Sequence, residues 1–434
     1  MRIKLFVVSI AFLTNLQAQD SSFTLKQSLD LAIKQNLDIQ IAQSDLEIAT
    51  INNNWGNAGA LPVVTGNIGN SEARTNINQK LANGSSIERN NVANSSINAN
   101  IGVSWRVFNG FRIRATKNRF DVLEKMGEMA VKQQIDQIIF NVTNVYYNLV
   151  RLNKQIKATK AIIELSKERL KIAETRFNVG SGAKTDMLQA GIDLNAQLVN
   201  LNRILNQVEN TKAGMNALLQ RNPNTPFHTS DNDFAIVKID FSNLMQKLES
   251  QNNLLQISAQ EKINLLNERK IINSQRLPSI TLNTSTVLNR SKSTAGFFLT
   301  NQTFGPNIGL AVGVPIFNGN VNKTQLKVNE IQVKQQANQQ ENLKTNLQRD
   351  LLIAYQDYLN AIENAKIEEN NVKLAEENNM ISTERFRKLQ SNSIELRQAQ
   401  LSLIEAQDRF IDAQFQAQIA VSTLLFISGE ISKY

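Results

Sequence analysis

The chain has 434 residues, a formal net charge of +9 at pH 7, a single histidine and no cysteine. The absence of cysteine excludes a disulfide framework and a thiolate metal site. No glycine-rich phosphate loop follows a predicted strand, and Lys and Arg are scattered along predicted helices rather than gathered in one patch. The composition therefore favours neither an enzyme nor a nucleic-acid-binding protein, and we expect no cofactor or metal.

The amino terminus has the pattern of an export signal. Arg2 and Lys4 precede an apolar run over residues 5–13, and polar residues follow at 17–20. This run is too short to remain as a membrane-spanning helix. We therefore expect residues 1–19 to be a cleaved signal peptide and the remaining chain to be exported.

The rest of the chain contains a long internal duplication. Phe108-Asn109-Gly110 returns as Phe317-Asn318-Gly319, 209 residues later, and Leu61-Pro62 returns as Leu277-Pro278, 216 residues later. A solenoid has units of about 20–50 residues, so these separations indicate a duplicated half-protein. The expected division is a first repeat over 20–220, an equatorial link over 221–240, a second repeat over 241–428 and a tail over 429–434.

Each repeat is predicted to contain a helix, a β-hairpin, a long helix and a shorter helix. The expected helices cover about 24–54, 111–178 and 185–220 in the first repeat, and about 241–274, 322–389 and 394–427 in the second. Apolar residues recur at alternating spacings of three and four, as in Ile135, Ile138, Val142 and Val145. This heptad spacing is typical of coiled-coil packing. An ordinary antiparallel helical bundle would account for it equally well.

The predicted hairpins, over 61–108 and 277–317, favour a membrane protein. Apolar residues alternate with polar or small ones from Ile97 to Val107 and from Ile308 to Ile316. Each stretch has about the 9–11 residues that a tilted strand needs to cross a bilayer, although a soluble sandwich uses the same alternation. Four strands cannot close a barrel, and lipid does not tolerate open sheet edges. Membrane-spanning strands would therefore require several chains to share one barrel.

Aromatic residues mark the helix-proximal ends of these strands. Trp105, Phe108 and Phe317 lie where an aromatic girdle would meet the membrane interface. We predict that these three residues are membrane-interface aromatics.

The chain resembles the TolC family of outer-membrane efflux proteins in several motifs and in their order. They are the opening segment 28–36, the two Leu-Pro and two Phe-Asn-Gly pairs, and the segment from Arg176 to Ala190. The resemblance covers nearly the whole mature chain. It implies a mainly α fold with a β-barrel part: long antiparallel coiled-coil helices and four transmembrane strands per chain, assembled as a trimer with twelve strands and a periplasmic helical tunnel.

The resemblance also implies partners and sites. The tunnel would be a passive duct, opened at its tip by a periplasmic adaptor and an inner-membrane pump of the RND or ABC type. The turn after the first long helix matches the adaptor-docking tip of the family: Val179, Gly180, Ser181, Gly182 and Thr185. Thr185 is suited to cap the next helix. The second turn, over 388–393, lacks these glycines, so the resemblance supports adaptor contact there less than at the first turn.

A periplasmic gate is expected beside these turns. Family members often carry two aspartates just after the second turn, where this chain has Glu395 and Gln398, with Arg397 between them. Asp186 lies near the start of the equivalent helix in the first repeat. The resemblance suggests an acidic ring at Glu395 and a pairing of Arg397 with a neighbouring chain. Two solvated charges at a helix start explain the pattern equally well.

Two functions fit the sequence. The first is the outer-membrane exit duct of an efflux or type I secretion system. The second is a structural or adhesive periplasmic coiled-coil protein without transport. The duct needs strands with one lipid-facing and one polar face, and the observed alternation supplies both.

Overall fold

The computed structural model describes residues 22–230, 234, 238–295 and 298–433. The expected signal peptide, residues 1–19, lies outside the described residues. The chain forms two compact units. Unit 1 comprises Met1–Ala42, Val131–Leu254 and Leu343–Tyr434, and unit 2 comprises Gln43–Ala130 and Leu255–Asn342. Each long helix contributes residues to both units.

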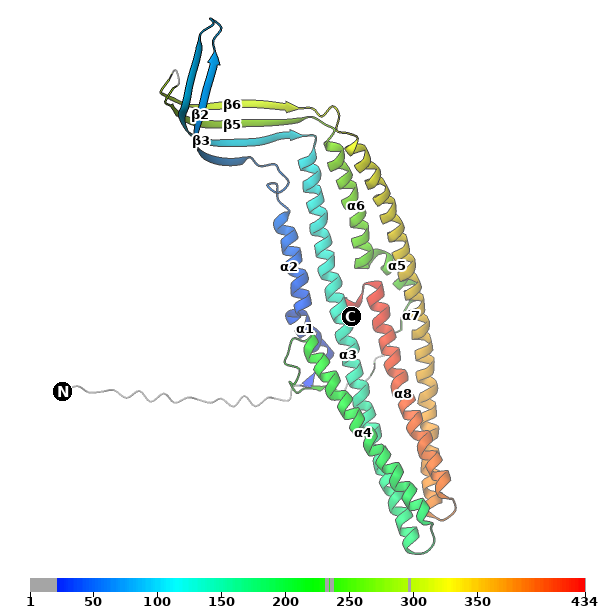
Figure 1. Ribbon diagram of the computed structural model, residues 1–434. Helices are drawn as coiled ribbons and strands as arrows, with labels where there is room; N and C mark the ends of the chain where they lie inside the picture. Colours follow the sequence, from blue (N-terminus) through cyan, green and yellow to red (C-terminus); the bar gives the residue numbers. More distant parts are fainter. Residues whose placement is uncertain (1–21, 231–233, 235–237, 296–297, 434) are drawn as a thin grey trace, which may run out of the picture. The chain divides into compact units, whose positions relative to one another are not determined.

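The same series of six elements occurs twice along the chain (Figure 1). The first series is α1 (Leu25–Gln35), α2 (Leu37–Asn52), β2 (Val63–Lys80), β3 (Ser86–Asn109), α3 (Arg112–Asn178) and α4 (Lys184–Leu218). The second is α5 (Phe241–Gln251), α6 (Asn253–Ser274), β5 (Ser279–Ser293), β6 (Thr300–Gly313), α7 (Val321–Arg387) and α8 (Ser393–Ser428). The short strands β1 (Ser22–Phe23) and β4 (His228–Thr229) pair in parallel, and a 3-10 turn, η1 (Ile431–Lys433), follows α8. The predicted mainly helical fold with a sheet part is confirmed.

The first helix of each repeat is broken, which the sequence interpretation missed. Asn36 separates α1 from α2, and Asn252 separates α5 from α6, each with extended backbone dihedrals. The Asn36 side chain donates a hydrogen bond of 3.0 Å to the carbonyl of Leu218, and that of Asn252 donates one of 2.9 Å to the carbonyl of Ile427. Each asparagine therefore interrupts its helix, and its side chain bonds to the end of the shorter helix in the same repeat.

Unit 2 contains a four-stranded antiparallel sheet in the order β2-β3-β5-β6 (Figure 1). Val63 lies opposite Ser104 in the first hairpin, and Ser279 lies opposite Gly313 in the second. These pairs are related by the 216- and 209-residue separations, so the duplication extends to strand register. Among the described residues, the outer edges of β2 and β6 have no strand partner.

The strand boundaries differ from those expected. The β6 strand ends at Gly313 instead of continuing to residue 317, because its partner β5 begins only at Ser279, directly after a proline. The first hairpin is longer than a membrane crossing requires, since β2 has 18 residues and β3 has 24. Its ladder shifts register between Thr75 and Ile77, where a bulge lies.

Unit 1 is held together by an apolar core. The heptad positions of α3 are buried there, among them Ile138, Val142, Leu149 and Leu152, and they pack with residues of α1, α2 and α4. By length and composition alone, α8 is the one described helix apolar enough to cross a membrane. Thirteen of its residues are buried within the chain, which is the pattern of a packed core helix.

Candidate functional site

The turn between α3 and α4 is a Schellman motif. Gly180 has a φ of 76°, and its N–H donates to the carbonyl of Phe177 at 3.0 Å. The N–H of Ser181 donates to the carbonyl of Arg176 at 2.9 Å. These two bonds satisfy carbonyls that the helix end would otherwise leave unpaired. A Cβ on Gly182 would lie 2.9 Å from the Cβ of Arg176, so the second glycine is required for space.

The turn between α7 and α8 has the same geometry without glycine. Leu389, 209 residues after Gly180, has a φ of 61° and donates to the carbonyl of Phe386 at 3.2 Å. The N–H of Gln390 donates to the carbonyl of Arg385 at 2.9 Å. The missing glycines therefore do not change the backbone geometry of the second turn. A leucine in the left-handed region costs about 1–2 kcal/mol, and its side chain is 61% exposed.

The helices that follow the turns are capped differently. Ala183 is the N-cap of α4 and makes no side-chain cap bond, so the prediction that Thr185 caps this helix is wrong. Asn392 caps α8, and its Oδ1 accepts from the backbone of Ile394 at 3.1 Å and of Glu395 at 2.9 Å. Thr185 lies one residue inside the first turn of α4, too late to accept from the orphan N–H groups.

A cluster of charged side chains, of which Arg169 is buried, joins α3, α4 and α8 behind the turns. The Arg169 guanidinium forms an ion pair with the Asp193 carboxylate and donates to Oε1 of Gln400 at 3.0 Å. Arg397 donates through Nε to Oδ2 of Asp193 at 2.9 Å, the same oxygen that accepts from Arg169. Gln189 donates to Oδ1 of Asp193 at 2.9 Å. We refer to Arg169, Asp193 and Arg397 as the tip cluster.

The tip cluster stabilises the ionised form of Asp193. Burial raises the pKa of this carboxyl, but hydrogen bonds from Arg169, Arg397 and Gln189 outweigh burial and hold the pKa below its ordinary value. The side chain of Arg169 is only 6% exposed. A buried guanidinium needs a paired carboxylate, so Asp193 is the residue on which the cluster depends.

The structure brings most of the predicted gate residues together. Thr185, Asp186, Arg397 and Gln398 line one cavity of about 310 Å³ with Arg169. Figure 1 shows the two turns side by side at the same end of the helices, and Ser393 at the start of α8 donates to Asp186 at 2.7 Å.

Glu395 does not line that cavity and forms a separate ion pair with Arg385 at 2.8 Å. Arg397 pairs with Asp193 of its own chain, where a pairing with a neighbouring chain was expected. Sequence reasoning missed Arg169 and Asp193, since each stands among other polar residues on a long helix. Such residues could have been found only as charged side chains on the helix face that the apolar repeat predicts to be buried.

The predicted interface aromatics lie at the helix-proximal end of the sheet. Trp105 donates from its indole nitrogen to the carbonyl of Ala60 at 2.8 Å. Phe108 packs edge-on against Phe111, with ring centroids 5.2 Å apart, and Phe317 is 78% exposed. Phe111, which is 65% exposed, was not among the predicted aromatics.

The described part of the chain contains no group of three or more His, Cys, Asp or Glu residues that could hold a metal ion.

Three solved structures of outer-membrane channels resemble this chain. The channel OprN has 16% sequence identity and a TM-score of 0.79, with 94% of this chain and 90% of that chain covered. VceC of Vibrio cholerae has 15% identity and a TM-score of 0.76 over 93% of this chain and 96% of its own. CmeC of Campylobacter jejuni has 18% identity and a TM-score of 0.78 over 94% and 85%. At these identities the likeness establishes the fold.

The sequence itself places the chain in a family. The model of the outer membrane efflux protein family matches residues 28–220 and 244–430. Comparison with functionally curated proteins gave no significant match. The chain belongs to the outer membrane efflux protein family. It is an outer-membrane protein with a periplasmic helical extension, and it provides the exit duct of an efflux system.

Proposed function

We propose that three copies of the chain share one twelve-stranded barrel, and that an adaptor and an inner-membrane pump open the helical turns. The observation that carries this proposal is the open-edged sheet. An unpaired backbone N–H or C=O group in the hydrocarbon of a bilayer costs roughly several kcal/mol. A membrane-spanning sheet therefore has to close into a barrel without free edges. Bacterial barrels have about eight strands or more. Two copies would reach that number, and the family resemblance favours three.

The duplicated register predicts how neighbouring sheets join. Within the chain Gly102 of β3 lies opposite Ser285 of β5. The residue 209 positions after Gly102 is Ala311 in β6, and the residue 216 positions before Ser285 is Gly69 in β2. If β6 joins the next sheet as β3 joins β5, Ala311 lies opposite Gly69 of the partner subunit.

A pair of equivalent glycines supports the same arrangement. Gly110 and Gly319 both have a φ of 64° at the start of a long helix. A Cβ on Gly110 would lie 2.5 Å from the carbonyl oxygen of Ser274, whereas one on Gly319 would meet nothing within 4 Å in the single chain. We infer that the segment just before β2 in a neighbouring chain lies beside Gly319, because Ser274 and Leu277 beside Gly110 likewise precede β5.

The two helical turns are proposed as the adaptor-docking surface. Each turn projects an exposed apolar side chain, Val179 in the first and Leu389 in the second, with exposed fractions of 71% and 61%. Exposed apolar side chains at the end of a helical hairpin favour contact with a partner over contact with water. The equal backbone geometry supports a role for both turns.

The tip cluster is proposed to hold the closed state. Asp193 connects three helices through Arg169 and Arg397, so any outward movement of α8 from α4 must break the bond between Arg397 and Asp193. Glu395 pairs with Arg385 at the second turn. We also propose that the Glu395 side chains of the three copies form an acidic ring in the trimer. To contribute to this ring, Glu395 has to leave its ion pair with Arg385.

Single-channel conductance tests the gate. We expect Arg397→Ala to raise the open probability of the purified trimer in planar bilayers, and Glu395→Ala to lower its cation preference. If both substitutions leave conductance and ion preference unchanged, neither residue belongs to the gate.

Crosslinking in living cells tests the docking surface. The chain has no native cysteine, so Ser181→Cys introduces a unique thiol at the first turn. We expect a bifunctional thiol-to-amine reagent to trap a periplasmic adaptor, identified by mass spectrometry. An adaptor of a proton-driven pump would indicate RND-type efflux, and one of an ATP-driven exporter would indicate ABC-type transport. If no adaptor is trapped by a well-expressed protein, the docking proposal fails.

A further inference from the structure

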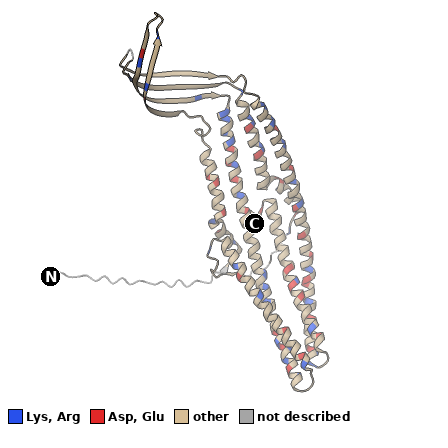
Figure 2. Ribbon diagram, in the orientation of Figure 1, with Lys and Arg blue, Asp and Glu red and all other residues tan. Residues whose placement is uncertain are grey.

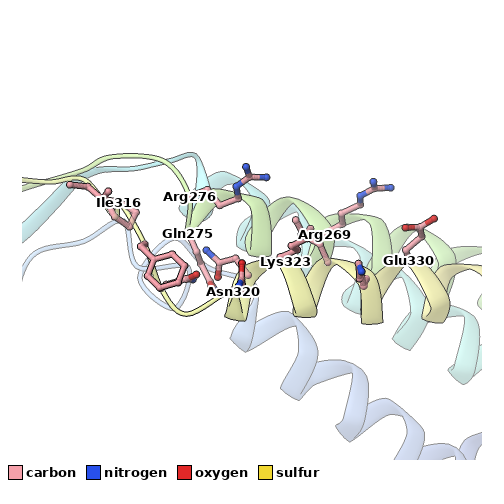
Figure 3. A pocket seen from close by; sticks show the side chains of 13 residues that line it. Arg269, Gln275, Arg276, Ile316, Asn320, Lys323 and Glu330 are labelled. Carbon is pink, nitrogen blue, oxygen red and sulfur yellow. The ribbon is translucent and has the colours of Figure 1, made fainter.

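A groove lined by cations lies in unit 2, where α6 and α7 approach the sheet. It is a cavity of about 590 Å³, and the four cations that line it are Arg269, Arg276, Lys323 and Lys327. Figure 3 shows Arg269 and Arg276 projecting to the same side, with Lys323 between them along the groove. Among the residues that the structure describes, none of these four cations forms an ion pair. The groove therefore carries an uncompensated positive charge.

The one carboxylate in the groove does not compensate this charge. Glu330 lies at the end of the groove farther from Ile316 (Figure 3). Its Oε1 is 3.5 Å from Nζ of Lys334, which is one helical turn further along α7. Glu330 is thus already engaged by a lysine outside the lining, and the four cations face open space.

The starts of both long helices carry positive charge as well. Neither α3 nor α7 has an acidic residue in its first turn. Exposed cations stand there instead, Arg112 and Arg114 in α3 and Lys323 in α7 (Figure 2). The helix macrodipole disfavours cations at an N-terminus. No acidic side chain in the first turn of either helix offsets this charge, so an anion from outside the chain would be favoured there.

A buried amide in the groove also lacks a partner. Along α7, Gln336 and Asn329 donate side-chain hydrogen bonds to α6, at 2.9 Å to the carbonyl of Ser258 and 3.0 Å to that of Leu265. Asn322 is the next residue in this seven-residue series and is 6% exposed. Its Oδ1 has no hydrogen-bond partner, and the same is true of Oδ1 of Asn329, which does not line the groove. A buried amide oxygen without a partner is costly, and a hydroxyl donor that enters the groove would satisfy that of Asn322.

The groove adjoins strongly exposed apolar residues. Ile316 and Phe317, which belong to the same lining, are 96% and 78% exposed in the single chain. They follow β6 at the helix-proximal end of the sheet, which in an outer-membrane protein with a periplasmic extension faces the periplasmic leaflet. A ligand suited to the groove has an anionic part for the cations and an apolar part for these side chains.

We propose that this groove binds the headgroup of an anionic phospholipid of the periplasmic leaflet, of which phosphatidylglycerol is the simplest. The phosphate lies among the four cations. A glycerol hydroxyl donates to Asn322, and the acyl chains pass over Ile316 and Phe317. The bound lipid sets the depth at which the start of α7 meets the membrane surface.

The test measures lipid binding to the purified full-length chain. Native mass spectrometry counts the molecules of dioleoylphosphatidylglycerol retained after titration in a neutral detergent, with dioleoylphosphatidylcholine and sodium phosphate as separate probes. The test variant combines Arg276→Gln with Lys323→Gln. The control combines Lys125→Gln with Lys262→Gln, which removes two exposed cations of unit 2 outside the groove.

We expect saturable binding of phosphatidylglycerol to the unaltered chain and at least tenfold weaker binding to the test variant, since a cation near an anionic lipid surface contributes roughly fivefold. The control should bind within about twofold of the unaltered chain. Circular dichroism and size exclusion confirm that each variant is folded. Should the test variant not fold, the pair Arg269→Gln and Lys327→Gln replaces it.

Three results would overturn the proposal. Equal binding of phosphatidylglycerol and phosphatidylcholine would show that the headgroup charge is not recognised. Unchanged binding by both groove variants would show that the lipid sits elsewhere. Sodium phosphate that competes as strongly as the lipid would show a site for free anions.

Discussion

Replacement of Asp193 by alanine is expected to loosen the helical turns of unit 1. The substitution leaves the guanidinium of Arg169, only 6% exposed, without its carboxylate, and it removes the bond to Arg397. Removing one partner of a buried ion pair costs about 3–5 kcal/mol. Asp193 is itself 21% exposed and Arg397 is 44% exposed, so water recovers part of this loss. We therefore expect a local destabilisation of about 2–4 kcal/mol.

Hydrogen exchange of the full-length protein in detergent measures this effect. Amides of α3 and α4 on either side of the first turn should exchange roughly 30–1000 times faster in Asp193→Ala, because each 1.4 kcal/mol corresponds to about tenfold. The matched control is Asp412→Ala, which breaks a more exposed pair with Arg151 and should change exchange by less than about fivefold. Replacing Arg169 and Asp193 together by leucine should recover much of the protection. If Asp193→Ala exchanges like the unaltered protein, the tip cluster does not hold the turns.

Further substitutions test the turns and the assembly. Gly110→Ala should prevent folding or lower the free energy of unfolding by roughly 2–5 kcal/mol, as thermal unfolding would measure, because it puts an alanine in the left-handed region and adds a steric clash. Gly319→Ala adds no clash within the single chain, so it should weaken the trimer more than the single chain. Leu389→Gly should raise the unfolding free energy by about 0.5–1 kcal/mol and weaken adaptor binding; a loss of stability would contradict the strain argument. Burial, and then the charge of Asp412, raise the pKa of Asp408, so its folded-state value lies above the unfolded one. The ionised form therefore destabilises the fold, a penalty that disappears as pH falls through the folded-state pKa. Asp408→Asn should accordingly be more stable than the unaltered protein at pH 7 and equal to it near pH 4, as thermal denaturation would show.

The sequence was most informative at the positions that are duplicated between the two repeats. The two Phe-Asn-Gly segments predicted the helix starts that the structure places at Arg112 and Val321, and the same separations relate Asn36 to Asn252 and their two acceptors. The expected bounds of α3, α4, α7 and α8 agree with the structure to within two residues, because the turn residues between these helices are visible in the sequence.

The remainder depends on contacts that no local pattern encodes. Leu389 adopts the left-handed conformation because two backbone bonds and the helix pair around it require it, although leucine alone disfavours it. Arg169 and Asp193 are 24 residues apart on different helices, and only the packing of the α3–α4 hairpin shows that they meet. The broken first helices were missed because asparagine is compatible with a helix and stops one only when its side chain finds a distant carbonyl.

Disulfide formation between β2 and β6 of neighbouring chains tests the shared barrel most directly. The variant with Gly69→Cys and Ala311→Cys carries the only two thiols of the chain. Residues directly opposite in antiparallel strands have Cα atoms about 4.5–5.5 Å apart, which suits a disulfide. The account predicts that oxidation in the outer membrane yields covalent dimers and trimers, and that pairing Ala311→Cys with Glu72→Cys yields none. Monomers alone from the first variant, or equal crosslinking from both, would contradict the proposed barrel and its register.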